Sequence, residues 1–181
     1  YLNLYLNLNT YVYTLFISFF FGVFFYFFND DKKKTTIYEK ILVVILGYFL
    51  LPLIISIPFY FSIYNLTFIN SYFEVISGFT STGFTIFENI KHLDQSLIIW
   101  RSSTQWLGGL YFLFSIILLI DIFDNSFKKS LTNFLSFNKA ETLKQSLKIF
   151  ILYSSITLII FIILNLFNIR TFNSLNLAMT I

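Results

Sequence analysis

Cysteine is absent from this 181-residue sequence, and His92 is its only histidine. Disulfides, thiolate metal sites, thiol chemistry and histidine clusters are therefore excluded within these residues. Charge is also scarce, because 12% of the residues are Asp, Glu, Lys or Arg, whereas soluble domains have about 25%. The chain is instead 57% hydrophobic, with 26 Phe and 12 Tyr. A core of this size could not bury so much apolar surface, so the sequence predicts an all-α integral membrane protein.

Four segments are long and apolar enough to cross a bilayer as helices. A crossing helix needs about 20 mostly apolar residues, because the hydrocarbon is about 30 Å thick and a helix rises about 1.5 Å per residue. Pro52 and Pro58 predict kinks in the second segment. The candidate spans are residues 1–28, 41–61, 98–120 and 149–168.

A further apolar stretch, residues 66–79, is too short to cross and contains Glu74. A short apolar segment bounded by glycines is typical of a re-entrant helix. A buried connecting loop is the alternative. The distribution of lysine favours the re-entrant interpretation, because nine of the twelve basic residues lie in the loops 29–40 and 121–148. Basic residues gather in cytoplasmic loops, and a full crossing at 66–79 would place these two loops on opposite sides.

The second of these loops contains apolar residues at helical spacing, with lysines between them. This pattern predicts an amphipathic helix on the inner membrane surface, and a solvated charged linker is the alternative. The apolar positions are Phe127, Leu131, Phe134 and Leu135.

After the short apolar stretch comes a run of hydroxyl residues, Thr80-Ser81-Thr82-Gly83-Phe84-Thr85. Irregular backbone at membrane depth is tolerated only inside protein or along an aqueous cavity. There, an extended chain can direct its carbonyl oxygens inward, and rings of carbonyls replace the water shell of a potassium ion. Gly83 suits this role, because it permits backbone angles that other residues resist. The run is a weak signal by itself, since soluble loops contain many such strings.

Its surroundings are more specific. The stretches "SYFEVISGFTSTGFTIF" and "IIWRSSTQWLGGLYFLFSIILL" resemble the first pore repeat of the Trk/Ktr/HKT superfamily of potassium transporters, and most closely its Trk-type bacterial membrane subunit. In that superfamily, four linked repeats each comprise an outer helix, a re-entrant pore helix, a filter strand and an inner helix. At the far end, "FNSLNLAMTI" resembles the second pore helix.

The resemblance implies a division of the chain. Residues 1–28 would be the last helix of an N-terminal pair, 29–40 a cytoplasmic loop, and 41–120 the first pore repeat. That repeat would contain the outer helix 41–61, the pore helix 66–79, the filter 80–85 and the inner helix 98–120. Residues 121–148 would be a cytoplasmic linker, and 149–181 the start of a second repeat, ending before its filter.

The resemblance also assigns roles to residues. The filter, and therefore the potassium-binding site, would be Thr80, Ser81, Thr82, Gly83 and Phe84, with only the backbone carbonyl of Phe84 facing the ion. Ser81 and Phe84 depart from the common pattern, which leaves the choice between potassium and sodium open.

Supporting roles fall on residues behind the filter. A charge at membrane depth usually has a partner, so we expect Glu74 to bind Arg101 or backbone amides and thereby join the pore helix to the inner helix. An ion-ligand role for Glu74 is the alternative. Gln105, Gly108 and Gly109 match the start of the superfamily's first inner helix, and the glycines allow close helix approach; a gating hinge is the alternative there.

The sequence thus predicts a multi-pass plasma-membrane protein, in a bacterium an inner-membrane protein, that takes up potassium and catalyses no reaction. No cofactor is expected, because potassium is cargo. The resemblance implies membrane lipid, a second copy of the chain and a cytosolic nucleotide-binding regulatory subunit as partners, and no nucleic acid. Two other classes remain: a non-conducting assembly protein or truncated gene product, and a lipid enzyme, for which no motif is present. Channel versus cotransport coupling, the gate and the regulator's identity are not readable here.

Overall fold

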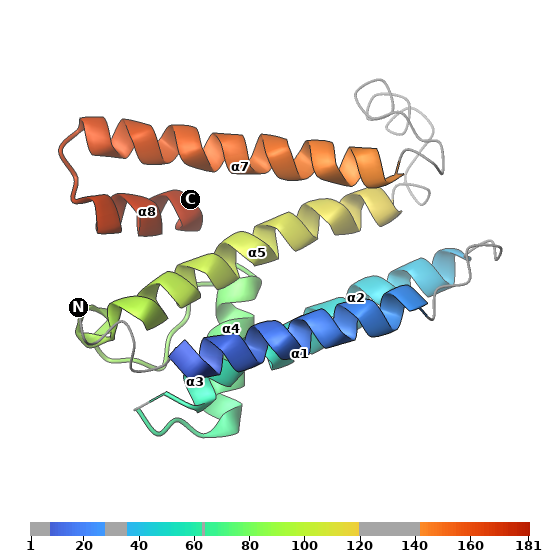
Figure 1. Cartoon of the computed structure of the whole chain (residues 1–181), viewed down its shortest axis with the longest axis horizontal. Coiled ribbons are helices and arrows are strands. Elements are labelled where there is room, and N and C mark those ends of the chain that lie inside the picture. Colours follow the sequence, from blue (N-terminus) through green and yellow to red (C-terminus); the bar gives the residue numbers. More distant parts are fainter. Residues whose placement is uncertain (1–7, 28–35, 63, 120–141) are drawn as a thin grey trace.

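Every regular element in the computed structural model is a helix, within the residues that it describes, namely 8–27, 36–62, 64–119 and 142–181. The long helices are α1 (Leu8–Phe27), α2 (Ile37–Ile55), α5 (Gln95–Leu119) and α7 (Thr142–Leu166) (Figure 1). The short ones are α3 (Ile57–Tyr60), α4 (Phe68–Phe79), α8 (Thr171–Thr180) and a 3-10 turn at Ile90–His92. The predicted amphipathic helix around 127–135 lies outside the described residues.

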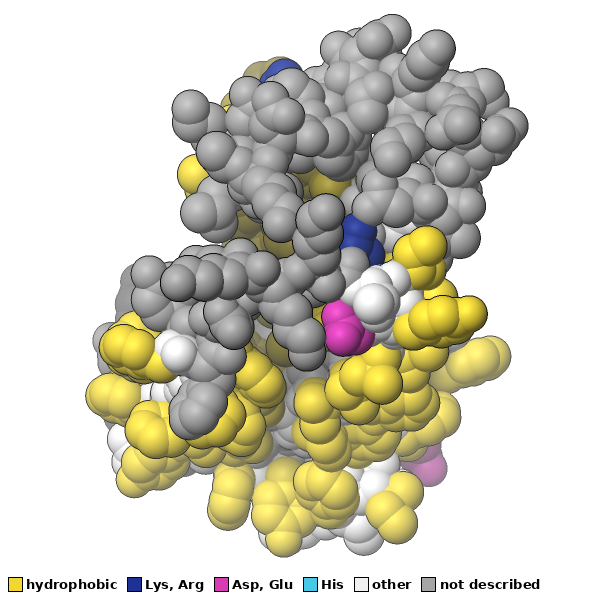
Figure 2. Space-filling view, turned by 90° about the vertical axis from the view of Figure 1, so that its right-hand side faces the viewer, with side chains coloured by type: hydrophobic (Ala, Val, Ile, Leu, Met, Phe, Trp, Pro, Cys, Tyr) yellow, Lys and Arg dark blue, Asp and Glu magenta, His cyan; other side chains and the backbone are white. Residues whose placement is uncertain are grey.

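Four helical segments are long and apolar enough to cross a membrane: Leu8–Phe25, Ile37–Tyr60, Gln95–Leu119 and Ser146–Leu166. Their outward surfaces are apolar, and hydrophobic side chains cover most of the described part of the face drawn in Figure 2. Phe20 on α1 is 73% exposed and Leu166 on α7 is 76% exposed. Large apolar side chains exposed in such numbers need lipid around them. The predicted all-α membrane fold is therefore confirmed.

The long helices alternate in direction. The C-terminal ends of α1 and α5 and the N-terminal ends of α2 and α7 lie together at the right-hand end of Figure 1. The helix ends that flank the two lysine-rich segments thus lie on one side of the bundle, as the charge distribution led us to expect.

α4 does not cross to that side. α3 ends and α5 begins at the left-hand end of Figure 1, so the chain between Tyr60 and Gln95 leaves and returns at one end of the bundle. α4 has 12 residues, and at about 1.5 Å per residue it is about 18 Å long, well short of the hydrocarbon thickness. The segment is re-entrant, as the sequence predicts.

Several helices begin earlier than hydropathy suggests. α2 begins at Ile37 rather than at 41, because Thr36 forms a capping box in which its hydroxyl accepts the Glu39 N–H and the Glu39 carboxylate accepts the Thr36 N–H. α5 begins at Gln95 rather than 98, and α7 at Thr142 rather than 149. Hydropathy marks only the lipid-facing part of a helix, whereas hydrogen bonding continues into the polar ends.

Pro52 and Pro58 lie on either side of the break between α2 and α3. α2 continues through the buried Pro52 and ends at Ile55, where Ser56 leads into α3 with Pro58 in its first turn. Pro58 has no backbone N–H, so it cannot continue the hydrogen bonds of α2. The indole Nε1 of Trp100 on α5 donates to the Ile55 carbonyl oxygen at 3.0 Å, which ties this break to the inner helix.

A small apolar core fixes the re-entrant helix. Phe59 of α3, Val75 of α4 and Leu97 of α5 are at most 1% exposed and form one cluster. Trp100 and Phe87 pack against it. α4 is therefore held between α3 and α5 along its buried face.

Candidate functional site

Hydrogen bonds define both ends of the short helix α4. Thr67 is its N-cap and accepts the Asn70 N–H through its hydroxyl. At the other end the Thr80 N–H donates to Ile76 and the Ser81 N–H to Gly78. Ser81 has a φ of +55°, so the chain turns out of the helix in the left-handed region.

Beyond this turn the backbone orients its peptide groups in one direction. The N–H groups of Thr82 and Gly83 both donate to the carbonyl oxygen of Ser77, at 3.0 and 3.4 Å. In a trans peptide the carbonyl points opposite to the N–H of the next residue. The carbonyls of Ser81 and Thr82 therefore point away from α4, toward the side on which residues 80–84 are exposed.

Glycine is required within this segment. Gly83 has a φ of +78°, and a Cβ built on it would meet nothing within 4 Å. Conformation rather than space therefore disfavours a side chain at this position. The positive φ at Ser81 and again at Gly83, with Thr82 between them, is the irregular geometry that the sequence suggested for a carbonyl-lined turn.

The backbone carbonyl of Phe84 has a different direction from the one that the resemblance implied. Its carbonyl oxygen accepts a 2.7 Å hydrogen bond from the Ser77 hydroxyl, so this oxygen is directed at α4 rather than presented with those of Ser81 and Thr82. Its ring is 69% exposed. A hydroxyl within reach on the buried face of the preceding helix turns this peptide inward. Ser77 was not singled out in the sequence, where it is one hydroxyl among many.

Glu74 and Arg101 form the expected pair. The Arg101 Nε lies 2.6 Å from Glu74 Oε1, and the Glu74 side chain is fully buried. The carboxylate also accepts the Thr85 hydroxyl at 3.0 Å and the Ile86 N–H at 3.0 Å. Both expected types of partner, the guanidinium and a backbone amide, are therefore present, and Thr85 is a third partner that sequence reasoning missed. Glu74 lies behind the exposed segment and joins α4, the returning chain and α5.

The two glycines of α5 have different neighbours. A Cβ on Gly108 would lie 1.8 Å from the carbonyl oxygen of Phe79, whereas one on Gly109 would meet the Tyr153 side chain, with its hydroxyl nearest at 2.5 Å. Backbone contact at Gly108 brings α5 against the end of α4. Of the two roles expected for these glycines, close helix packing is the one that a contact supports, namely that of Gly108 with the Phe79 backbone.

Another face of α5 contacts α8. The Gln105 side chain donates to the Thr180 carbonyl oxygen at 3.0 Å, and the Ser102 hydroxyl donates to Asn176 Oδ1 at 2.9 Å. α8 folds back beside α7 and ends next to α5 (Figure 1). α5 thus packs against both short helices, α4 and α8.

α8 repeats a local feature of α4. Ser71 of α4 and Ser174 of α8 are both 0% exposed. Each donates its N–H to the carbonyl oxygen four positions earlier, that of Thr67 or Arg170. The Ser71 hydroxyl also donates to Thr67, whereas the Ser174 hydroxyl lies 3.1 Å from the Ile169 carbonyl oxygen and 3.3 Å from that of Arg170. An Asn precedes each serine. The two short helices thus share an Asn-Ser pair with a buried serine near their N-terminal ends.

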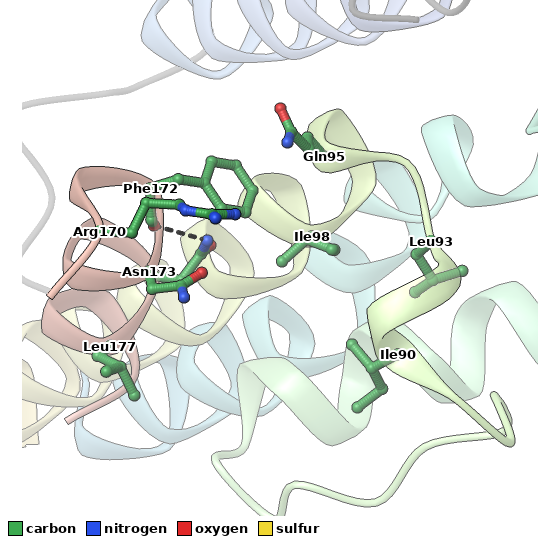
Figure 3. Close-up of a pocket in the computed structure, with 9 residues that line it drawn as sticks. Ile90, Leu93, Gln95, Ile98, Arg170, Phe172, Asn173 and Leu177 are labelled. Atoms are coloured by element: carbon green, nitrogen blue, oxygen red, sulfur yellow. Dashed lines mark hydrogen bonds between the residues drawn. The ribbon is translucent and has the colours of Figure 1, made fainter.

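A cavity lies elsewhere in the molecule. A pocket of about 660 Å³ lies between the loop before α5 and the start of α8. Figure 3 shows Arg170, Phe172 and Asn173 on one side of it, with Ile90 and Leu93 on the other. None of the predicted site residues lines it. Within the described residues, no group of three or more acidic or histidine side chains could hold a metal ion.

The fold and this site define a class: a multi-pass helical membrane protein with a re-entrant helix followed by an irregular, hydroxyl-rich turn. The family model for TrkH, described as "Cation transport protein", matches residues 8–180. The chain therefore belongs to the TrkH family of cation transport proteins.

Individual relatives agree. The chain is 28% identical over 109 residues to an uncharacterized cation transporter of Methanocaldococcus jannaschii, covering 59% of this chain and 23% of that protein. It is 36% identical over 73 residues to the Trk system potassium uptake protein TrkH of Escherichia coli K12, covering 40% and 15%. To the corresponding TrkI of Halomonas elongata it is 40% identical over 60 residues, covering 33% and 11%. The chain thus spans less than a quarter of these relatives.

A solved structure shows the same fold. The crystal structure of the potassium transporter TrkH from Vibrio parahaemolyticus superimposes with a TM-score of 0.72 at 19% identity, over 94% of this chain and 35% of that one. The family consists of transporters, which confirms that the chain is not an enzyme. Together with the four apolar helices, it also confirms a multi-pass protein of the plasma (bacterial inner) membrane.

Proposed function

We propose that this chain forms the first quarter of a potassium uptake pore, with residues 80–83 as one strand of its selectivity filter. The observation that supports this most is the orientation of the peptides at Ser81 and Thr82, whose carbonyls point away from α4 on the exposed side. Carbonyl oxygens presented in this way can replace the hydration shell of an alkali cation. Residue 84 closes the strand rather than binding the ion, because its carbonyl is bonded to Ser77.

The electrostatics of the site suit a cation. α4 directs its C-terminal end, which carries partial negative charge, toward the turn. Residues 75–87 contain no charged side chain, so dipoles alone would coordinate the ion. A site of neutral dipoles binds an ion without retaining it, which conduction requires. Glu74 and Arg101 act as a brace behind the strand, not as ion ligands.

One strand cannot surround an ion, so the pore needs further strands from the parent protein. We assign residues 41–120 to its first pore repeat and 149–181 to the start of its second. As partners we propose membrane lipid, a second copy of the subunit and a cytosolic nucleotide-binding regulatory subunit. Proteins named Trk system potassium uptake proteins are among the relatives, which supports potassium as the cargo.

The test is the substitution Gly83→Ser in the full-length parent protein. A side chain at Gly83 would meet nothing within 4 Å in this chain, so within these residues the substitution acts on the positive φ. We expect surface expression to be retained and the potassium-over-sodium uptake ratio to fall by roughly tenfold, equivalent to ~1.4 kcal/mol. Gly78→Ala is the matched control, since its Cβ would make only an ordinary 3.5 Å contact with Thr104. An unchanged ratio in Gly83→Ser would reject the filter assignment.

A further inference from the structure

Ser77 has an arrangement of hydrogen bonds unlike that of the other buried serine of α4. A helical serine commonly donates to the carbonyl one turn earlier, and Ser71 does so, to Thr67 at 3.0 Å. Ser77 is 3% exposed, and its hydroxyl instead donates seven residues forward, to the Phe84 carbonyl at 2.7 Å. It therefore contributes its donor to the returning chain and not to its own helix.

The same hydroxyl also accepts. The Thr82 hydroxyl lies 3.1 Å from Ser77 Oγ and 3.0 Å from the Ser77 carbonyl oxygen. That carbonyl receives the N–H groups of Thr82 and Gly83 as well. Ser77 thus bonds to the Thr82 hydroxyl, to the N–H groups of Thr82 and Gly83, and to the carbonyl oxygen of Phe84.

These bonds fix both ends of the proposed filter strand. The bonds to Ser77 O set the direction of the Ser81 and Thr82 carbonyls, and they belong to the backbone, so they survive any substitution at residue 77. The bonds to Ser77 Oγ give the Thr82 hydroxyl a second partner beside the Ser77 carbonyl oxygen, and they turn the Phe84 carbonyl toward α4. Only these depend on the side chain. Without the hydroxyl, the Phe84 carbonyl would lose its partner and could rotate toward the open side.

We propose that Ser77 is a specificity-determining positioning residue, whose hydroxyl holds Thr82 and the Phe84 peptide so that the carbonyls between them keep one spacing. This inference rests on the proposed function. A filter discriminates between cations by the number and geometry of its coordinating oxygens. A loosened strand would contract around a smaller ion, so selectivity would fall more than total uptake.

The test uses the full-length parent protein in reconstituted vesicles, with potassium and sodium uptake measured separately. We expect Ser77→Ala to lower the potassium-over-sodium ratio at least threefold, mainly by raising sodium uptake, with the melting temperature in detergent retained. Ser77→Thr, which keeps the hydroxyl, should restore the ratio. Ser71→Ala is the matched control, because Ser71 is equally buried in the same helix but bonds only within it.

The outcomes separate the two proposals. If Ser77→Ala keeps the wild-type ratio while Gly83→Ser lowers it, the role of Ser77 is overturned and the filter assignment stands. If neither substitution changes the ratio, the proposed function itself fails. Should Ser77→Ala not fold, Ser77→Cys decides, since a thiol is a weaker donor of similar size: a reduced ratio supports the proposal and a wild-type ratio overturns it.

Discussion

Gly108 of α5 lies directly against Phe79, the last residue of α4: a Cβ at position 108 would be 1.8 Å from the Phe79 carbonyl oxygen and 2.8 Å from its Cα. The neighbour is backbone, so it cannot rotate away as a side chain would. The end of α4, from which the proposed filter strand starts, is thus positioned by the absence of a side chain at Gly108 of α5.

Gly108→Ala should therefore destabilise the protein. Overpacking costs about 1–3 kcal/mol, more than the gain of up to about 1 kcal/mol from replacing a helical glycine with alanine. We expect a lower melting temperature of the full-length parent in detergent and reduced uptake. Gly22→Ala is the control, because its Cβ would meet nothing within 4 Å. Equal melting temperatures for the two variants would contradict the close contact.

The Glu74–Arg101 pair makes a different prediction, because its two members are unequally buried. The Arg101 side chain is 16% exposed and that of Glu74 is 0% exposed. Arg101→Met would leave a buried carboxylate without its counter-charge, which costs about 3–5 kcal/mol. The yield of folded parent protein should fall sharply.

The double variant Glu74→Gln/Arg101→Met should recover much of that loss. No buried charge remains, and the amide oxygen can still accept from the Thr85 hydroxyl and the Ile86 N–H. Folded yield measured by size-exclusion chromatography would check it. A double variant as poorly folded as Arg101→Met alone would mean that the ion pair itself, not the unpaired charge, determines folding.

The sequence predicted the membrane spans well because hydropathy is a local property. It predicted the ion pair well because the chain offers few charged partners. Hydropathy finds each crossing helix, and a buried Glu in a charge-poor chain has few possible counter-ions, so Arg101 could be named. Ser77 and Thr85 could not be singled out, since their roles depend on how the returning chain lies against α4. Glycine at 108 predicted close packing, but only the fold shows that its neighbour is the Phe79 backbone.

The contact between α5 and α8 can be tested by crosslinking. Ser102 Oγ lies 2.9 Å from Asn176 Oδ1, and this chain contains no native cysteine. In a parent protein whose other cysteines are replaced, the pair Ser102→Cys/Asn176→Cys should react with a short bifunctional thiol reagent. Ser102→Cys/Ser155→Cys is the control, because Ser155 is exposed on α7 and bonds within its own helix. Crosslinking of the control pair alone would show that α8 does not pack on α5.

The re-entrant path makes the sharpest topological prediction, because it places the residues before and after α4 on one side. Phe61 precedes α4 and Glu88 follows its returning strand, and both are exposed. Single cysteines at these two positions should react with a membrane-impermeant thiol reagent added to the outside of cells. Tyr38→Cys, at the 84% exposed start of α2, should react only after the inner face is opened, since a crossing helix separates it from Phe61. If α4 crossed the membrane, Glu88→Cys would instead label together with Tyr38→Cys, and residues 80–83 could not belong to a re-entrant loop that lines a pore from its outer side.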